Sequence, residues 1–536
     1  MPAERNPAEP GTSGRDARPP AIELRSISKT FGPVWANRDV WLAVESGSIT
    51  GIVGENGAGK STLMSILYGL YKADSGDIII EGRPARIRNP HEAIAAGIGM
   101  VHQHFMLVET LTVLENVVLR AEQGPILRTD LAAARRELAR LEREYGLRVD
   151  PDATVGDLPV GEQQRVEILK ALYRGARILI LDEPTGVLTP QETNQLFRIL
   201  QALRDRGATV ILITHKLREI MAVTDAVWVM RHGEVVAHRR TAVTNPEELA
   251  ELMVGRKVRL QLDKPAPHPG EAVLVAEGIG LRDGRGVALL EGIDLVLRAG
   301  EIVGVAGVSG NGQSELLELL AGMRPPTTGR LVVAGREVTP QRPGDPTEMR
   351  RLGVAHVPED RVRHAMVGAF EAAETSILGY HRSPRYGGPW RLKHDAVRAH
   401  CAGLMEGFDV RPRDPTLRSS SFSGGNQQKL VLAREIVREP RVLLVGQPTR
   451  GVDIGAVAFI HRQLIAMREA GCAVLLVSAE LEEVMALADR ILVMCGGRIV
   501  GTVAGAATDE RTLGQMMANL APGSREPASA GPGATS

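Results

Sequence analysis

The strongest structural signal in this chain is GSITGIVGENGAGKS, residues 47–61. The segment ITGIV has the composition of a short buried strand, and TLMSILYGL after the glycines has the pattern of a helix. Residues 54–61 fit GxxxxGK[ST] in full, in the strand–loop–helix context that this pattern requires. We therefore expect a phosphate-binding loop at the start of a parallel α/β domain.

Each part of this loop has an expected role. Its glycines let backbone N–H groups curl around phosphate oxygens, and the following helix N-terminus adds the positive end of its dipole. Lys60 is expected to bridge the β- and γ-phosphates of a nucleotide, and Ser61 to ligate Mg²⁺. The predicted nucleotide-binding residues of the loop are Gly54, Glu55, Asn56, Gly57, Ala58, Gly59, Lys60, Ser61 and Thr62.

An acidic pair ends a second apolar strand, ILILD at 178–182. Asp182 is predicted to hold Mg²⁺ directly or through water, and the adjacent Glu183 to polarise the attacking water. Such a pair by itself more often caps the next helix, but downstream of a phosphate loop the catalytic interpretation is favoured. His215, after the strand TVILIT, is predicted to hold the γ-phosphate and to orient that water.

Four further residues are candidates for the surroundings of the nucleotide. Gln103 in MVHQHF is predicted to sense the γ-phosphate and magnesium. Phe31, upstream of the loop, is predicted to stack on adenine, and an ordinary core aromatic is an equally good interpretation. His102 and His104 form an HxH pair, for which local packing is a better explanation than metal binding.

The chain is an internal repeat of two halves. GEIVGVAGVSGNGQS at 300–314 repeats the loop at an offset of 253, and VLLVGQPTRG repeats ILILDEPTGV at an offset of 264. Strands and helices alternate in both halves, which predicts parallel sheets with ligands at the carboxyl ends of the strands. We expect a disordered leader at 1–20, a domain at 21–260, a linker at 261–271, a second domain at 272–520 and a disordered tail at 521–536.

The second half has lost the residues that are expected to do chemistry. The replacements, first half to second, are Lys60 to Gln313, Asp182 to Gly446, Glu183 to Gln447, His215 to Ala479 and Gln103 to Glu359. Gln313 brings no charge to a phosphate, and Gln447 cannot accept a proton from water. The second half is therefore expected not to hydrolyse nucleotide, although its glycines and Ser314 leave nucleotide binding open.

Composition narrows the classes of protein that remain. The 64 basic residues balance 64 acidic ones, which argues against a protein that grips nucleic acid by bulk charge. The three cysteines include no CxxC pair, so neither a disulfide framework nor a zinc site is indicated. The N-terminus lacks the apolar core of a signal peptide, and no apolar run approaches the roughly 18–20 residues that span a bilayer. A membrane role would therefore require other chains.

The phosphate loop, Gln103, LPVGEQQ, DEP and His215, in this order and duplicated, resemble an ABC-type ATPase with two nucleotide-binding domains, over nearly all of 21–520. Within that superfamily, SFSGGNQQKLVLAREI and QPTRGVDIGA resemble the fused ATP-binding subunits of simple-sugar and nucleoside importers. HQHFML and VGEQQRVEILKAL are closer to the nucleoside type. The resemblance implies two tandem α/β P-loop domains, each with a RecA-like parallel-sheet core, a helical subdomain and an antiparallel β subdomain.

The resemblance also implies a signature loop that reaches a nucleotide on another domain. The second half matches it with Ser423, Gly424, Gly425 and Asn426, where the first half has PVGE at 159–162. In this superfamily domains dimerise head to tail, and each ATP lies between one phosphate loop and the opposite signature loop. Such pairing joins the intact loop to the intact signature, and the two defective elements to each other. One working site per chain is therefore expected.

As cofactors the resemblance implies ATP and Mg²⁺, with hydrolysis at the Lys60, Glu183 and Ser423 site driving import of a nucleoside or simple sugar. The implied partners are two transmembrane permease subunits and an extracytoplasmic substrate-binding protein, without nucleic acid. The chain would then lie peripherally at the cytoplasmic face of the plasma (inner) membrane. Two alternatives stay open: a soluble tandem ATPase acting on ribosomes or DNA, which usually has two intact loops, and a nucleotide-sensing regulator.

Overall fold

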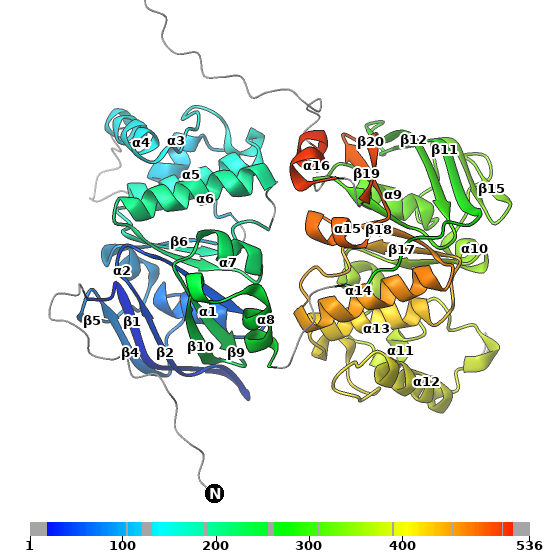
Figure 1. The fold of residues 1–536 in the computed structure, drawn as a ribbon, viewed down its shortest axis with the longest axis horizontal. Helices are drawn as coiled ribbons and strands as arrows, with labels where there is room; N and C mark the ends of the chain where they lie inside the picture. Colours follow the sequence, from blue (N-terminus) through cyan, green and yellow to red (C-terminus); the bar gives the residue numbers. More distant parts are fainter. Residues whose placement is uncertain are drawn as a thin grey trace, which may run out of the picture. The chain divides into compact units, whose positions relative to one another are not determined.

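The computed structural model describes residues 19–102, 105–119, 131–186, 188, 190–255, 262–308, 310–387, 391–452, 454–505 and 508–517. These residues form two compact units, each with its own sheets and core (Figure 1). Unit 1 holds the described residues up to Gly186 together with Gln195–Gly255, and unit 2 holds those of Val187–Asn194 and those after Gly255.

Unit 1 is built on a six-stranded sheet of order β10-β9-β3-β8-β7-β6. Its strands are β3 (Ile49–Gly54), β6 (Ile98–Val101), β7 (Ile178–Asp182), β8 (Thr209–Ile213), β9 (Ala226–Arg231) and β10 (Glu234–Arg240). All neighbours are parallel except β9 and β10. Every residue of β3, β7 and β8 is buried, as expected for parallel strands that are covered on both faces.

A second, antiparallel sheet of order β2-β1-β4-β5 completes the β structure of unit 1. Its strands are β1 (Ile22–Phe31), β2 (Val34–Val44), β4 (Ser75–Ile80) and β5 (Arg83–Ala85). The helix α1 (Lys60–Leu67) joins both sheets in one core, because its Leu63 and Met64 cluster with Leu24 of β1 and Ile180 of β7. The phosphate loop is thereby held between two sheets.

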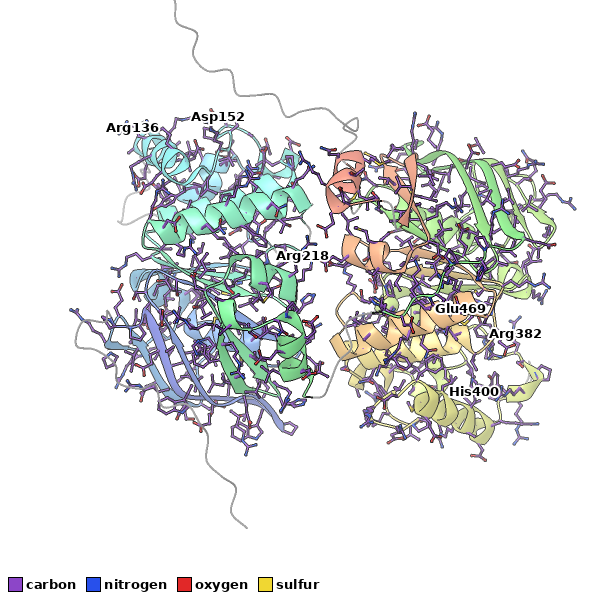
Figure 2. The ribbon with its side chains drawn as sticks, viewed as in Figure 1. Arg136, Asp152, Arg218, Arg382, His400 and Glu469 are labelled. Carbon is purple, nitrogen blue, oxygen red and sulfur yellow. The ribbon has the colours of Figure 1, made fainter. Side chains whose placement is uncertain are left out.

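Three helices of unit 1 form a separate helical subdomain. They are α3 (Val113–Val118), α4 (Leu131–Tyr145) and α5 (Val160–Tyr173), which contact one another. Thr112 and Glu115 form a capping box that begins α3. Asp152, labelled near α4 in Figure 2, accepts a hydrogen bond of 2.8 Å from Arg135 Nη1. The other helices are α2 (Pro90–Ala95), α7 (Leu217–Val223) and α8 (Pro246–Val254), together with α6 (Pro190–Asp205), which belongs to unit 1 from Gln195 onward.

Unit 2 repeats both sheets of unit 1. Its six-stranded sheet has the order β16-β17-β18-β13-β19-β20, and its antiparallel sheet has the order β12-β11-β14-β15. The strands are β11 (Ala272–Arg282), β12 (Ala288–Arg298), β13 (Ile302–Ala306), β14 (Thr328–Val333), β15 (Arg336–Val338), β16 (Val354–Val357), β17 (Val442–Gly446), β18 (Ala473–Val477), β19 (Arg490–Cys495) and β20 (Arg498–Ala504). The predicted class of two tandem α/β domains with parallel-sheet cores and antiparallel sheets is confirmed.

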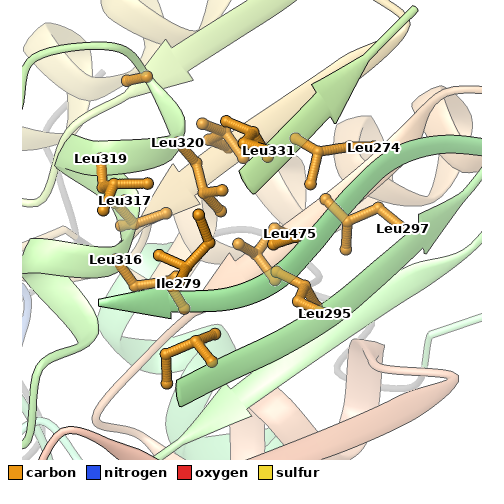
Figure 3. Packing of buried hydrophobic residues seen from close by; sticks show 14 of the residues in the cluster. Leu274, Ile279, Leu295, Leu297, Leu316, Leu317, Leu319, Leu320, Leu331 and Leu475 are labelled. Carbon is orange, nitrogen blue, oxygen red and sulfur yellow. The ribbon is translucent and has the colours of Figure 1, made fainter. Parts of the chain in front are cut away.

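The helices of unit 2 are α9 (Gln313–Leu320), α10 (Pro346–Arg351), α11 (Ala372–Thr375), α12 (His394–Gly407), α13 (Gly424–Ile436), α14 (Ile454–Glu469), α15 (Leu481–Leu487) and α16 (Glu510–Met517). Figure 3 shows the leucines of α9 packed against Leu274 of β11 and Leu475 of β18, the same sandwich as around α1. In the helical part, His400 of α12 lies with its ring centroid 5.2 Å from that of Tyr386 (Figure 2).

The described part of the predicted linker is bound to unit 2. Residues 262–271 form no helix or strand, yet Lys264 Nζ lies 2.9 Å from Asp489 Oδ1 and Arg468 Nη2 donates to Pro265 O at 2.7 Å. Both Arg468 and Asp489 have buried side chains. Residues 1–18 of the predicted leader and the whole predicted tail lie outside the described residues. Within the described ranges, every helix is too short or too polar to cross a bilayer.

Candidate active site

The phosphate loop connects β3 to α1 and depends on glycine at two points. Gly57 and Gly59 have φ values of +83° and +95°, which L side chains rarely adopt. A Cβ on Gly59 would lie 2.1 Å from Ala36 O, whereas a Cβ on Gly57 would meet no atom within 4 Å. No described side chain caps α1, so its first N–H groups are available to an anion. Asn56 and Gly57 are exposed, and Ala58 is buried.

The side chain of Lys60 binds back to carbonyl groups of its own loop. Its Nζ donates to Gly54 O at 2.8 Å and to Glu55 O at 3.0 Å, and the side chain is buried. Burial lowers the pKa of Lys60, and the carboxylates of Glu183 and Asp182 oppose this effect. The ammonium group is therefore held within reach of both carboxylates, at the helix N-terminus where a phosphate would bind.

Ser61 and Asp182 provide two oxygen donors beside the loop. Ser61 Oγ donates to Asp182 Oδ1 at 3.4 Å, across 121 residues of sequence. Burial raises the pKa of Asp182, and the hydrogen bond from Ser61 opposes that rise. Hydroxyl and carboxylate oxygens are the ligands that Mg²⁺ prefers, so this donor set fits that ion.

Glu183 and His215 meet at the ends of neighbouring parallel strands. Glu183 follows β7 with a φ of +47°, and its N–H donates to Ile213 O at the end of β8. His215 Nδ1 lies 3.0 Å from Glu183 Oε1. The hydrogen bond with His215 lowers the pKa of Glu183, while burial opposes that effect. The arrangement keeps an ionised carboxylate, a suitable proton acceptor, next to the loop.

Sequence reasoning missed the residues that anchor this acidic segment. Gln164 of α5 donates from Nε2 to Pro184 O at 2.8 Å. Buried Glu219 of α7 accepts from Thr214 Oγ1 at 2.9 Å and pairs with Thr185. The backbone that carries Glu183 is thus fixed from two helices. Gln164 falls in the quoted segment VGEQQRVEILKAL without a pattern that marks its role. Glu219 is a polar residue on the otherwise apolar buried face of α7, which is too common a pattern to be diagnostic.

A second missed residue lies under the phosphate loop. Asn37 of β2 is fully buried, and its Nδ2 donates to Gly59 O at 3.1 Å. Its Oδ1 has no hydrogen-bond partner among the described residues. At the matching point of unit 2 stands Leu290, whose Cδ2 lies 2.9 Å from a Cβ built on Gly312. Asn37 therefore holds the loop of unit 1 by a bond that unit 2 lacks.

The predicted aromatic and histidine residues lie in different surroundings. Phe31, at the end of β1, is 44% exposed and contacts Tyr71 edge-to-face at 5.3 Å between ring centroids, so it is not a core aromatic. His102 packs its ring against Tyr68 at 5.8 Å. Gln103 and His104 lie outside the described residues. Lys29 Nζ lies 5.5 Å from the centroid of the Phe31 ring, and the stacking of this ring on adenine stays a prediction.

In unit 2 the corresponding side chains are uncharged, but they still form hydrogen bonds. Gln313 Nε2 donates to Val308 O at 3.1 Å, as Lys60 does to Glu55 O. Gln447 repeats the positive φ of Glu183, at +46°, and its Oε1 accepts from Ala479 N at 3.1 Å. The backbone of the site is therefore preserved in unit 2, whereas the ammonium group, the acidic pair and the histidine are replaced.

The predicted signature residues lie at the start of α13 in unit 2. Ser423 is the N-cap residue, and Asn426 Nδ2 donates to Ser423 Oγ at 2.9 Å. A Cβ on Gly424 would lie 2.5 Å from Arg361 Nη2, and Gly425 is buried. In unit 1 the N-cap of α5 is Pro159, which offers no hydroxyl. The candidate residues around Lys60 and Glu183 therefore belong to unit 1, and Ser423–Asn426 belong to unit 2.

Comparisons with known proteins agree with this geometry. The family model "ABC transporter" matches residues 37–186 and 290–450. A nucleoside import ATP-binding protein, NupA, of Lactococcus lactis subsp. cremoris is 45% identical, over 92% of this chain and 97% of that protein. The guanosine import ATP-binding protein NupO of Bacillus subtilis is also 45% identical, over 93% and 97%. The glucose import ATP-binding protein TsgD13 of Haloferax volcanii is 44% identical, over 93% and 96%. The chain therefore belongs to the ABC transporter family, with two of its ATP-binding domains in one polypeptide.

Proposed function

We propose that this chain is the ATPase subunit that energises an importer for a nucleoside or a simple sugar. Its relatives are ATP-binding proteins of nucleoside, guanosine and glucose import, matched over nearly their whole length. Its partners would be two transmembrane permeases, which hold it at the cytoplasmic face of the membrane, and an extracytoplasmic substrate-binding protein. The relatives do not favour the alternative of an ATPase that acts on ribosomes or DNA.

One observation carries the catalytic part of the proposal: Lys60, Ser61, Asp182, Glu183 and His215 meet at one edge of the unit 1 sheet. The N–H groups of the loop and Lys60 bind the phosphates of ATP, and Phe31 stacks on the adenine. Ser61 and Asp182, with Gln103, would hold Mg²⁺, which would neutralise charge that develops on the phosphates.

Glu183 is the group that moves a proton. Its ionised carboxylate accepts the proton of the attacking water, and His215 holds the carboxylate and orients the water toward the γ-phosphate. The hydrogen bond between the two side chains supports this role, because it favours the ionised form of Glu183. Both residues therefore contribute to hydrolysis, with His215 acting through the ionised carboxylate of Glu183.

We also propose that the signature loop of unit 2 takes part in ATP hydrolysis, as the resemblance of its sequence implies. Ser423, Gly424, Gly425 and Asn426 present a hydroxyl and a helix N-terminus, which suit a γ-phosphate. ATP binding and hydrolysis would switch the chain between two states, and that switch would drive alternating access in the permeases.

The test is Glu183→Gln in the full chain. We expect ATP turnover to fall by about 10²–10⁴-fold, the usual size of a general-base contribution, while MgATP binding is retained. The matched control is Gln447→Ala at the corresponding point of unit 2, which should leave the chemical step nearly untouched. Substantial ATPase activity in Glu183→Gln would rule out the assignment.

A further inference from the structure

The helical part of unit 2 carries basic residues that no acidic residue interrupts. Residues 376–394 read SILGYHRSPRYGGPWRLKH and include four Arg or Lys residues but no Asp or Glu. These four are Arg382, Arg385, Arg391 and Lys393, and all of them are exposed. We call them the basic cluster. Among the residues that the structure describes, none of the four forms an ion pair.

The helical subdomain of unit 1 instead pairs its arginines with carboxylates. On α4, Arg140 Nη2 lies 2.7 Å from Glu137 Oε1, and Arg135 Nη1 donates to Asp152 Oδ2 at 2.8 Å. Neighbouring charges of opposite sign cancel at a distance, as is usual for a solvent-exposed helix. The uncompensated positive charge is therefore a property of the basic cluster and is not shared by both helical parts.

A buried tyrosine fixes the backbone that carries the basic cluster. Tyr386 ends a 3-10 turn, Pro384–Tyr386, and is fully buried in a cluster that includes Val397 of α12. Its hydroxyl accepts from Arg438 Nη2 at 2.8 Å, and its carbonyl accepts from Lys393 N at 2.9 Å. The second bond brings Lys393 back beside the 3-10 turn. The basic side chains before and after Tyr386 are thereby held near one another.

A glycine allows the sharp turn after Tyr386. Gly387 has a φ of +113°, and a Cβ there would lie 2.0 Å from Arg391 O. This close approach places Arg391 beside the 3-10 turn as well. The basic cluster is thus a compact, anchored feature of the surface.

The positive charge of the cluster acts on its surroundings. Burial lowers the pKa of His400 to about 4, and the charges of Arg385 and Arg438 act in the same direction. Arg382 and His400 are both labelled in Figure 2. Like charges that are gathered in one place raise the free energy of the folded chain, and an anionic partner would offset this cost.

We propose that the basic cluster binds the anionic lipid headgroups of the membrane at which this chain works. The inference rests on the proposed function only for placing the chain beside a membrane. The cytoplasmic leaflet has a negative surface potential, and each Lys or Arg near such a surface strengthens binding by about fivefold. Four exposed cations on an anchored turn suit a surface of many phosphate groups.

Two other anionic partners match the cluster less well. The cytoplasmic loops of membrane proteins carry an excess of Lys and Arg, so the permeases of the proposed importer would repel it. A nucleic acid fits poorly with a chain whose 64 basic residues balance 64 acidic ones. Charge complementarity therefore favours the lipid surface.

The test is sedimentation of the full chain with lipid vesicles, in the absence of permeases. We expect binding to vesicles of equal parts phosphatidylglycerol and phosphatidylcholine, and none to phosphatidylcholine alone. Binding should be lost in about 1 M salt, where the screening length falls to about 3 Å. Replacing all four residues of the basic cluster with glutamine should weaken binding by about a hundredfold or more, at about fivefold for each charge.

The matched control removes four exposed arginines that are ion-paired. It combines Arg25→Gln, Arg135→Gln, Arg140→Gln and Arg330→Gln, whose partners are Glu23, Asp152, Glu137 and Glu277. The control changes the net charge by the same amount as the cluster variant, and we expect it to keep vesicle binding within a few-fold of the unaltered chain. ATP turnover in solution checks that both variants are folded.

A second variant guards against misfolding of the fourfold one. Arg382→Gln alone should weaken binding to the anionic vesicles by about fivefold. Unchanged binding by this variant, or by the fourfold variant, overturns the inference. So does equal weakening in the matched control, because net charge would then be the cause.

Two further outcomes contradict the inference. The first is a lack of binding of the unaltered chain to the anionic vesicles. The second is binding to polyglutamate without binding to vesicles, which would assign the basic cluster to an acidic protein partner. Either outcome leaves the proposed function intact if the unaltered chain still hydrolyses ATP, whereas loss of that activity contradicts the proposed function itself.

Discussion

His215 Nδ1 and Glu183 Oε1 lie 3.0 Å apart, although 32 residues separate them in the chain. They meet because β7 and β8 are parallel neighbours, so that the residues following each strand emerge at the same edge of the sheet. The same edge carries the phosphate loop after β3. The hydrogen bond is the largest cause of the lowered pKa of Glu183.

Replacing His215 with alanine should therefore move the acidic limb of the pH–rate profile. Loss of the hydrogen bond raises the pKa of Glu183, so the carboxylate is protonated, and activity lost, at a higher pH than in the unaltered chain. The measurement is ATPase rate against pH. His238→Ala, which removes a ring stacked on Trp228 at 4.1 Å, is the control and should leave the limb in place. An unmoved limb in His215→Ala would contradict the assigned pairing.

Asn37→Leu, which copies the residue of unit 2, tests the bond under the loop. Gly59 O loses the bond from Asn37 and keeps only the helical bond from Leu63 N–H, so we expect the KM for ATP to rise by about fivefold, the equivalent of one hydrogen bond of roughly 1 kcal/mol, with a smaller change in kcat. Thermal unfolding should be little affected, because the substitution also removes the unpaired Oδ1. A fall in kcat with an unchanged KM would contradict this positioning role.

Gly59→Ala should abolish ATP binding. The added Cβ would lie 2.1 Å from Ala36 O and would impose a left-handed φ on a residue with a side chain, so the loop must move. Gly146→Ala is the matched control: its φ is +72°, but a Cβ there meets nothing within 4 Å. We expect that control to lose about 1 kcal/mol of unfolding free energy and to keep its ATP affinity. Equal ATP affinities in the two variants would contradict the close approach.

The asymmetry of the signature loops predicts unequal effects of two similar substitutions. Ser423→Ala removes the hydroxyl at the start of α13 and should lower ATPase activity by about tenfold, whereas Pro159→Ala at the start of α5 should change it little. Steady-state ATPase assays on both variants provide the measurement. If Pro159→Ala lowers the rate as much as Ser423→Ala, the role proposed for the signature loop of unit 2 is wrong.

Lys60, Asp182, Glu183 and His215 could be predicted from the sequence because each lies at or soon after the end of a buried strand. Runs such as ILILD and TVILIT are continuous apolar segments, and parallel strands deliver the residues after them to one edge of the sheet. Asn37 gave no such signal, because it lies on β2 of the other sheet, 22 residues before the glycine that it holds. Cross-sheet contacts of this kind leave no periodic pattern.

Local patterns were sufficient to establish the two α/β halves, the phosphate loop and the loss of charged groups from the second half. Each of these follows from residue type and spacing along the chain. The partner of Ser314 was settled by packing between strands. Glu359 stands where the first half has Gln103, and it meets the serine hydroxyl because Gly446 leaves space at the end of the neighbouring strand. Contacts between neighbouring strands join positions far apart in the chain, so they emerge only when the sheet is assembled.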